Sequence, residues 1–183
     1  MTMIRPGIQP KPGVALRLAA GSWRVNPAQS QALFAVRMAG RPVRGRLPLT
    51  GRVLIAEPIE DSTATLAARA SQVSTGYPML DRQLAGPSFL DAGSFPEIRF
   101  RSGLLAWLPA GWRAAGSLQV KGTEHELACQ LDMDRDGEPL DDSSPFRITS
   151  NWILDSRWVT RQWIPGLSRR ITMTCSFLLE PDL

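Results

Sequence analysis

Residues 71–103 read SQVSTGYPMLDRQLAGPSFLDAGSFPEIRFRSG, and this stretch decides the fold more than any other part of the chain. A polar insert at 75–95, punctuated by Pro and Gly, leads into PEIRFRS (96–102), where apolar or small residues alternate with charged ones. Alternation with a period of two is the signature of a β-strand with one buried face. Helix signals occur in the insert only at 78–84 and 87–92, so we expect one or two short helices there.

The same alternation recurs along most of the chain and predicts an all-β domain. The expected strands are 23–26, 32–38, 43–56, 62–73, 97–102, 104–108, 112–121, 126–133, 146–154 and 168–180. About eight strands suffice to close an antiparallel barrel, and closure removes exposed sheet edges. We therefore expect an irregular N-terminal arm at 1–21 and a single barrel domain at 22–183.

Composition narrows the function classes. The chain has 183 residues, 43% of them apolar, which suits one domain with a sizeable core. The formal charge is +4, and the basic residues, nearly all arginines, are scattered along the sequence. Nucleic-acid binders usually gather their charge on one stripe, so we expect no nucleic-acid partner.

The N-terminus and the cysteines bear on the cellular compartment. The apolar stretch 14–20 is broken by Arg17, so it lacks the unbroken core of a secretory signal. No segment approaches the ~20 apolar residues of a membrane span. Cys129 and Cys175 each lie within an apolar alternation, as buried small hydrophobic residues do. These features predict a cytoplasmic protein with reduced cysteines.

Several short motifs resemble the YceI-like family over roughly residues 22–135. The matching residues are Trp23 to Asn26, Ser30, Phe34 to Val36, Ser71, Ser74, Thr75, Asp81, Leu84, Phe89, Asp91, Phe95, Pro96, Ile98, Phe100, Leu118, Val120, Gly122 and Thr123. The resemblance implies a lipocalin-like antiparallel β-barrel that carries an isoprenoid or another long-chain amphiphilic lipid. Relatives commonly have an Asp and two His where this chain has Asn26, Gln29 and Gln83, so the lipid's head group is expected to differ.

The inward faces of the predicted strands supply the candidate cavity lining. The candidates are Phe34, Leu66, Leu84, Phe89, Phe100, Leu118, Leu131, Met173 and Phe177. Alternation alone fits a filled core as well as an open cavity, because eight strands enclose a space that side chains can fill. The small residues at 64–70 and 114–116, together with the family resemblance, favour an open cavity.

The tract 151–170 interleaves Trp and Arg. Either Trp152 is core and the arginines are solvated, or the tract contacts a phosphate-bearing head group or a membrane surface. Arg157 and Arg161 are the first head-group candidates, and Arg82 in the insert is the second. A transient membrane contact and a homodimer are both left open.

Two further patterns are weaker. Asp132-x-Asp134-x-Asp136-Gly137 resembles the start of a calcium loop, but its twelfth position is Ser143 rather than the required Glu. His125 is the only histidine, so it cannot build a three-ligand zinc site, and we interpret it as a surface turn residue. We therefore predict no metal, no cofactor and no catalytic residues.

The resulting hypothesis is non-catalytic binding or carriage of a hydrophobic small molecule, an isoprenoid-type lipid, inside the barrel. One alternative is a ligand-free barrel that serves as an interaction or stress-response module. Another is a small isomerase or hydrolase using Asp81 or His125, although the sequence offers no pair of nucleophile and base.

Overall fold

The structure is a computed structural model that describes residues 19–108, 111–134 and 144–182. It contains ten strands: β1 (Gly21–Val25), β2 (Gln31–Met38), β3 (Arg41–Pro48), β4 (Thr50–Ile55), β5 (Thr63–Arg69), β6 (Glu97–Leu108), β7 (Gly111–Val120), β8 (Thr123–Asp134), β9 (Phe146–Asp155) and β10 (Arg170–Pro181). One α-helix, α1 (Pro78–Ala85), and three 3-10 turns, η1 (Ile59–Asp61), η2 (Ala70–Gln72) and η3 (Ser156–Trp158), complete it. Most of the predicted arm at 1–21 lies outside the described residues.

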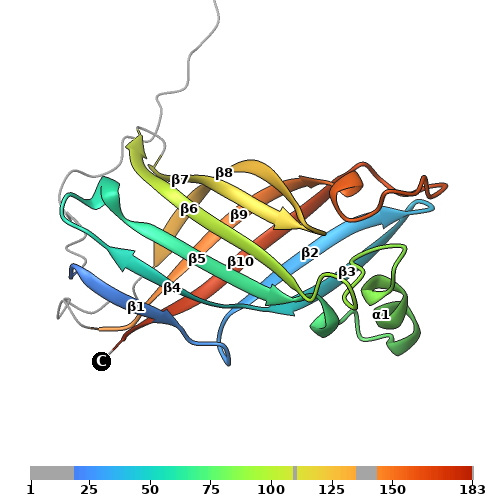
Figure 1. Cartoon of the computed structure of the whole chain (residues 1–183), viewed down its shortest axis with the longest axis horizontal. Coiled ribbons are helices and arrows are strands. Elements are labelled where there is room, and N and C mark those ends of the chain that lie inside the picture. The colour runs from blue at the N-terminus through green and yellow to red at the C-terminus, as the bar shows by residue number, and fades with distance from the viewer. Residues whose placement is uncertain (1–18, 109–110, 135–143, 183) are drawn as a thin grey trace, which may run out of the picture.

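The strands form a closed antiparallel barrel (Figure 1). From β4 to β10 each strand pairs with the next along the chain, and β1 pairs with both β4 and β10. The hairpin of β2 and β3 extends the same arrangement, because β2 also pairs with β10. Thus β1 and β2 are two parts of one barrel strand, β3 and β4 are parts of another, and the barrel has eight strands. The predicted lipocalin-like fold is confirmed.

Several strand boundaries differ from the sequence-based prediction, and in two places a predicted strand is divided or two are joined. Residues 43–56 were expected to form one strand, but the ladder breaks at Leu49, whose N–H donates to Ser30 O at 3.0 Å. Conversely, the two strands expected on either side of Gly103 are the single strand β6, with a bulge between Ser102 and Leu104. In the first case the chain bends at Leu49, and the hydrogen bond to Ser30 lies outside the strand ladder. In the second, a bulge absorbs one residue without ending the pairing.

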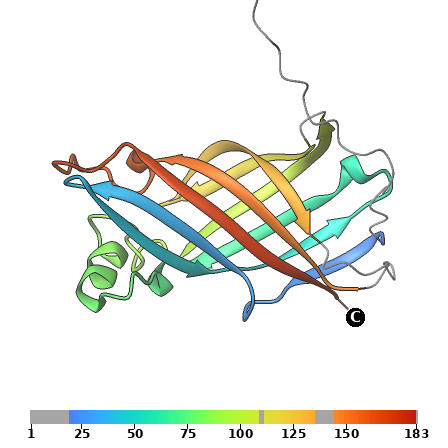
Figure 2. The same ribbon diagram turned by 180° about the vertical axis from the view of Figure 1, so that it is seen from behind.

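One end of the barrel is covered by the insert and by two hairpin tips (Figures 1 and 2). In the insert, Pro78 at the first turn starts α1, and the Thr75 hydroxyl and N–H both donate to Asp81 Oδ1 at 2.6 Å. Residues 87–92, the second helix candidate, form turns instead. The connection from β9 to β10 joins the β2–β3 turn, with Gly166 O accepting from Ala39 N–H at 2.8 Å.

The opposite end is packed more tightly. Trp23 and Phe146 meet edge to face with ring centroids 5.0 Å apart, and Leu179 beside them is fully buried. On β10 the alternation read from the sequence is realised, with Ile171, Cys175, Phe177 and Leu179 all buried. Among the described residues there is no helix with the length and apolar character needed to span a bilayer.

The β6–β7 hairpin provides a test of how closely this barrel is packed. A Cβ atom added at Gly116 would lie 2.0 Å from Arg101 O, which is main chain of the paired strand and cannot rotate away. We expect Gly116→Ala to lower the free energy of unfolding by about 1–3 kcal/mol or more, as other forced contacts do. Chemical denaturation measures the change.

Gly103→Ala in the same hairpin is the matched control, because a Cβ atom there meets nothing within 4 Å. It should be neutral or stabilising by up to about 1 kcal/mol. Equal destabilisation by both substitutions would contradict the assigned packing.

Candidate functional site

An apolar cavity of about 120 Å³ lies inside the barrel, next to the end covered by the insert. Side chains from β2, β3, β5, β6, β7, β9 and β10 line it, and Leu84, Phe89 and Leu90 of the insert and Val159 and Leu167 after β9 close it. Ser156 is the one hydroxyl-bearing residue in this lining. The arrangement can hold an apolar group away from water and offers it few polar contacts.

The structure puts all nine predicted lining residues on the barrel interior. Phe34, Leu66, Leu84, Phe89, Phe100, Leu118 and Met173 line this first cavity. Leu131 and Phe177 line a second apolar cavity of about 60 Å³, which lies further toward the opposite end. That these residues contact a ligand stays a prediction.

Leu66, Phe100 and Trp152 separate the two cavities, since these three side chains line both. Phe100 on β6 and Trp152 on β9 meet across the interior, with ring centroids 4.7 Å apart. Trp152 is held by its indole N–H, which donates to Ser150 Oγ at 2.6 Å. We call this layer of three side chains the partition. It divides the described interior into two cavities.

The size of the first cavity limits its contents. A dry apolar cavity of about 150 Å³ in another protein holds one benzene molecule, which has six carbons. At about 120 Å³, the first cavity has room for a group of similar size, about five or six carbons. A longer chain requires side chains of the partition or of the covering segments to move.

A buried cation lies beside the end of the first cavity. Lys121 is only 8% exposed, and its ammonium donates to Pro87 O at 3.4 Å and to Val159 O at 3.5 Å. No carboxylate of the described ranges forms an ion pair with it. Lysine is almost never fully buried without a paired charge. Sequence reasoning missed Lys121, since its position in a turn gave no sign of burial.

The interpretation of His125 as a surface turn residue is wrong. His125 lies in β8 directly opposite Leu118, so it shares the inward face of the hairpin. Its ring stacks on Trp158 at a centroid distance of 4.2 Å, and Nε2 is buried with no hydrogen-bond partner in the described chain. The strand begins at Thr123, three residues earlier than alternation suggested, because Lys121 takes a positive φ of 50° and makes the turn very tight.

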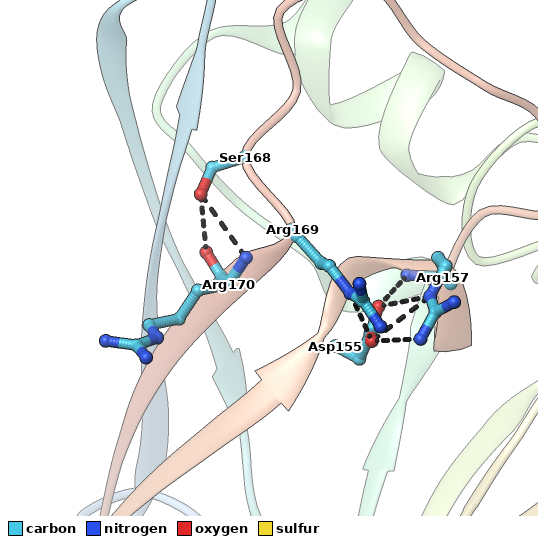
Figure 3. Close-up of polar contacts among 5 residues, drawn as sticks. All are labelled: Asp155, Arg157, Ser168, Arg169 and Arg170. Carbon is cyan, nitrogen blue, oxygen red and sulfur yellow. Dashed lines mark hydrogen bonds and ion pairs between the residues drawn. The ribbon is translucent and has the colours of Figure 1, made fainter.

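The arginine candidates lie outside the cavities. Arg157 and Arg169 converge on Asp155 (Figure 3), at 2.7 Å from Arg157 Nη2 and 3.1 Å from Arg169 Nε to Oδ2. Hydrogen bonding from Arg157 holds the pKa of the Asp155 carboxyl well below its usual range. Arg161 and Arg82 are exposed, and neither cavity has an arginine among its described lining residues. Their role toward a head group stays a prediction.

Both cysteines are buried in the interior as reduced thiols, as the sequence predicted. Burial raises the pKa of Cys129 to about 11 and that of Cys175 to about 12. The described ranges contain no group of three or more His, Cys, Asp or Glu residues that could hold a metal ion. In the calcium-loop pattern, Asp132 and Asp134 belong to β8, while Asp136, Gly137 and Ser143 lie outside the described residues.

Comparison with known proteins agrees with this architecture. Residues 23–157 match the YceI-like domain. The sequence matches no curated protein closely enough to serve as a relative.

Among solved structures, BcnA of Burkholderia cenocepacia is similar with a TM-score of 0.72 and 16% identity, over 84% of this chain and 98% of that one. A polyisoprenoid binding domain from Saccharophagus degradans, implicated in plant cell wall breakdown, has a TM-score of 0.63 and 13% identity, over 87% and 98%. The YCEI protein of Campylobacter jejuni has a TM-score of 0.66 and 13% identity, over 77% and 86%. At these identities the likeness concerns the fold.

The raised thiol pKa values generate a prediction. Only the thiolate reacts with disulfide reagents, and a free cysteine has a pKa of about 8.5. At pH 8 the folded protein should therefore react far more slowly than the protein unfolded in guanidinium. Because the folded pKa values are raised, the free energy of unfolding should also fall as the pH rises above about 8.5. Thiol titration and denaturation at several pH values measure both effects, and rapid labelling of the folded protein would contradict the sealed interior.

Proposed function

Because this chain belongs to the YceI-like family, we propose that it binds a hydrophobic small molecule, an isoprenoid-type lipid, non-catalytically inside the barrel. The supporting observation is a closed barrel whose first cavity is about 120 Å³ and lined almost entirely by apolar side chains. A solved domain of the same fold is described as polyisoprenoid binding, which supports the choice of ligand class.

The energetics favour recognition of the ligand's hydrocarbon chain over recognition of its head group. Burial of one CH₂ group contributes about 0.8 kcal/mol, so an isoprene unit contributes roughly 3–4 kcal/mol before costs. A charge-assisted hydrogen bond to a head group contributes only about 1.5–3 kcal/mol. Affinity should therefore rise with chain length until the accessible cavity is full.

Chain-length dependence tests the proposal. For a series of isoprenoid alcohols of one to four units, we expect affinity to stop rising beyond about one unit, when the chain fills the first cavity and reaches the partition. Titration calorimetry measures the affinities, and native mass spectrometry detects a lipid that co-purifies. An empty barrel that binds no member of the series would contradict ligand binding and favour an interaction module.

The partition variant sharpens the same test. Phe100→Leu shortens the side chain that closes the boundary between the cavities. The chain length at which affinity stops rising should therefore increase. Phe34→Leu is the matched control, because Phe34 lines the first cavity but not the second. It should leave the chain length at which affinity stops rising unchanged. A shift in both variants would mean that the extra space, rather than the partition, sets the accepted length.

We further propose Lys121 as the group that an acidic head contacts. Its side chain contacts the main chain of both segments that close the first cavity, at Pro87 and at Val159. A head group at this end of the cavity would supply an anion to the buried ammonium, which no described carboxylate reaches. Arg157, Arg161 and Arg82 stay as the candidates drawn from the sequence alone.

Lys121→Gln should weaken binding of an isoprenoid acid or phosphate by about 10- to 100-fold, the loss of a charge-assisted hydrogen bond. It should spare the matching alcohol. Calorimetry with each acid–alcohol pair measures the difference. The double variant Arg157→Gln/Arg161→Gln is the control, and selective loss of acid binding in that variant instead would assign the head group to the arginines.

A further inference from the structure

The fold gathers scattered arginines into one surface at the covered end of the barrel. We call this surface the basic tip and define it as residues 37–44, the β2–β3 turn, together with residues 155–170, the connection from β9 to β10. Main-chain hydrogen bonds join its halves, from Ala39 N–H to Gly166 O at 2.8 Å and from Ser168 N–H to Arg37 O at 2.7 Å. The two segments are therefore one continuous surface, although 110 residues separate them in the sequence.

The basic tip is far more positive than the rest of the chain. Seven arginines and one carboxylate, that of Asp155, give it a formal charge of +6. The whole chain carries +4, so the remaining residues sum to −2. All seven arginines are exposed: Arg37, Arg41, Arg44, Arg157, Arg161, Arg169 and Arg170. Figure 3 shows that Arg170 points away from Asp155, while Arg157 and Arg169 converge on it.

Large apolar side chains accompany this charge. Trp163 in the tip is 86% exposed, more than any other large hydrophobic residue among those described. On the barrel wall behind the tip, Ile153 on β9 and Leu33 on β2 flank β10 and are 59% and 46% exposed. A tryptophan ring suits the boundary between head groups and acyl chains.

The basic tip also forms part of the first cavity. Met38 and Val43 on one half, and Val159 and Leu167 on the other, line that cavity from within. Whatever binds the outer face of the tip therefore sits one layer of side chains from the cavity.

From these observations we propose that the basic tip docks on an anionic lipid bilayer, with Trp163 inserted at the interface and the arginines on the lipid phosphates. This docking goes beyond ligand binding in the cavity and does not depend on it. The arginines alone would also suit nucleic acid, on which Trp163 could stack. The bilayer is favoured because the tip exposes one large aromatic ring, that of Trp163, whereas grooves for single-stranded nucleic acid stack successive bases on several rings.

Sedimentation with vesicles tests the proposal on the full chain. We expect binding to vesicles of phosphatidylcholine with 30% phosphatidylglycerol, because the anionic lipid gives the surface a negative potential that attracts arginines. Pure phosphatidylcholine should bind weakly, and added salt should release the protein. Each arginine near such a surface raises the partition coefficient about fivefold, so Arg41→Gln/Arg170→Gln should lower it about 25-fold.

Matched controls separate the tip from general charge and hydrophobicity. Arg101→Gln/Arg113→Gln removes two exposed arginines from β6 and β7 and should have much less effect. Trp163→Ala should weaken vesicle binding, whereas Leu54→Ala, at a half-exposed position on β4, should not. Trp163→Phe provides a second readout, since quenching of tryptophan fluorescence by brominated lipid should be much stronger in the wild type than in this variant, which keeps the other five tryptophans. Circular dichroism checks that each variant is folded.

Three results would overturn the proposal. The first is vesicle binding that does not depend on lipid charge. The second is an equal loss of vesicle binding in the tip pair and the control pair of arginine variants. The third is binding to duplex DNA, or to a second copy of the chain, without any binding to vesicles. Isoprenoid alcohol binding is measured separately on the same variants and should not change. Failure of docking and failure of cavity binding are therefore distinguishable.

Discussion

The main-chain pairing of β10 with both β1 and β2 is the constraint on which the rest of the structure depends. It joins β10 to the first barrel strand and closes the wall. Among the described strands, the outer side of β3, which is bridged from Arg46 to Ser74, is the edge that remains. Because hydrogen bonds between strands close the wall, the interior is free to be partly empty. The cavities, the partition and the covering segments all follow from that closure.

Alternation in the sequence was enough to predict the barrel and the direction of its inward side chains. Phe100 and Phe177 point inward because a strand with period two leaves no other arrangement that buries both. The residues at which strands begin and end were less predictable. Gly103 and Leu49 show why, since a glycine can mark either the end of a strand or a bulge, and a buried leucine can lie in a strand or in a bend.

The features nearest to function depend on contacts between residues far apart in the sequence. Nothing local in the sequence indicates that Phe100 meets Trp152 across the interior, or that Lys121 reaches the carbonyl of Val159. His125 faces inward only because Leu118 is its partner in the hairpin, and that pairing depends on the tightness of one turn. Likewise, the arginines that looked scattered in the sequence gather only when the β2–β3 turn meets the β9–β10 connection.

The partition has a consequence for how such proteins diversify. Its three side chains make no hydrogen bond to the strands they cross, apart from the indole of Trp152 to Ser150. Exchange of Leu66 or Phe100 for another apolar residue therefore alters the shape of the interior while the ladder of main-chain bonds stays intact. Chains that keep this barrel at 13–16% identity illustrate how much substitution the wall tolerates. The fold can accordingly change the shape of its cavities through single replacements inside a scaffold that does not need to be rebuilt.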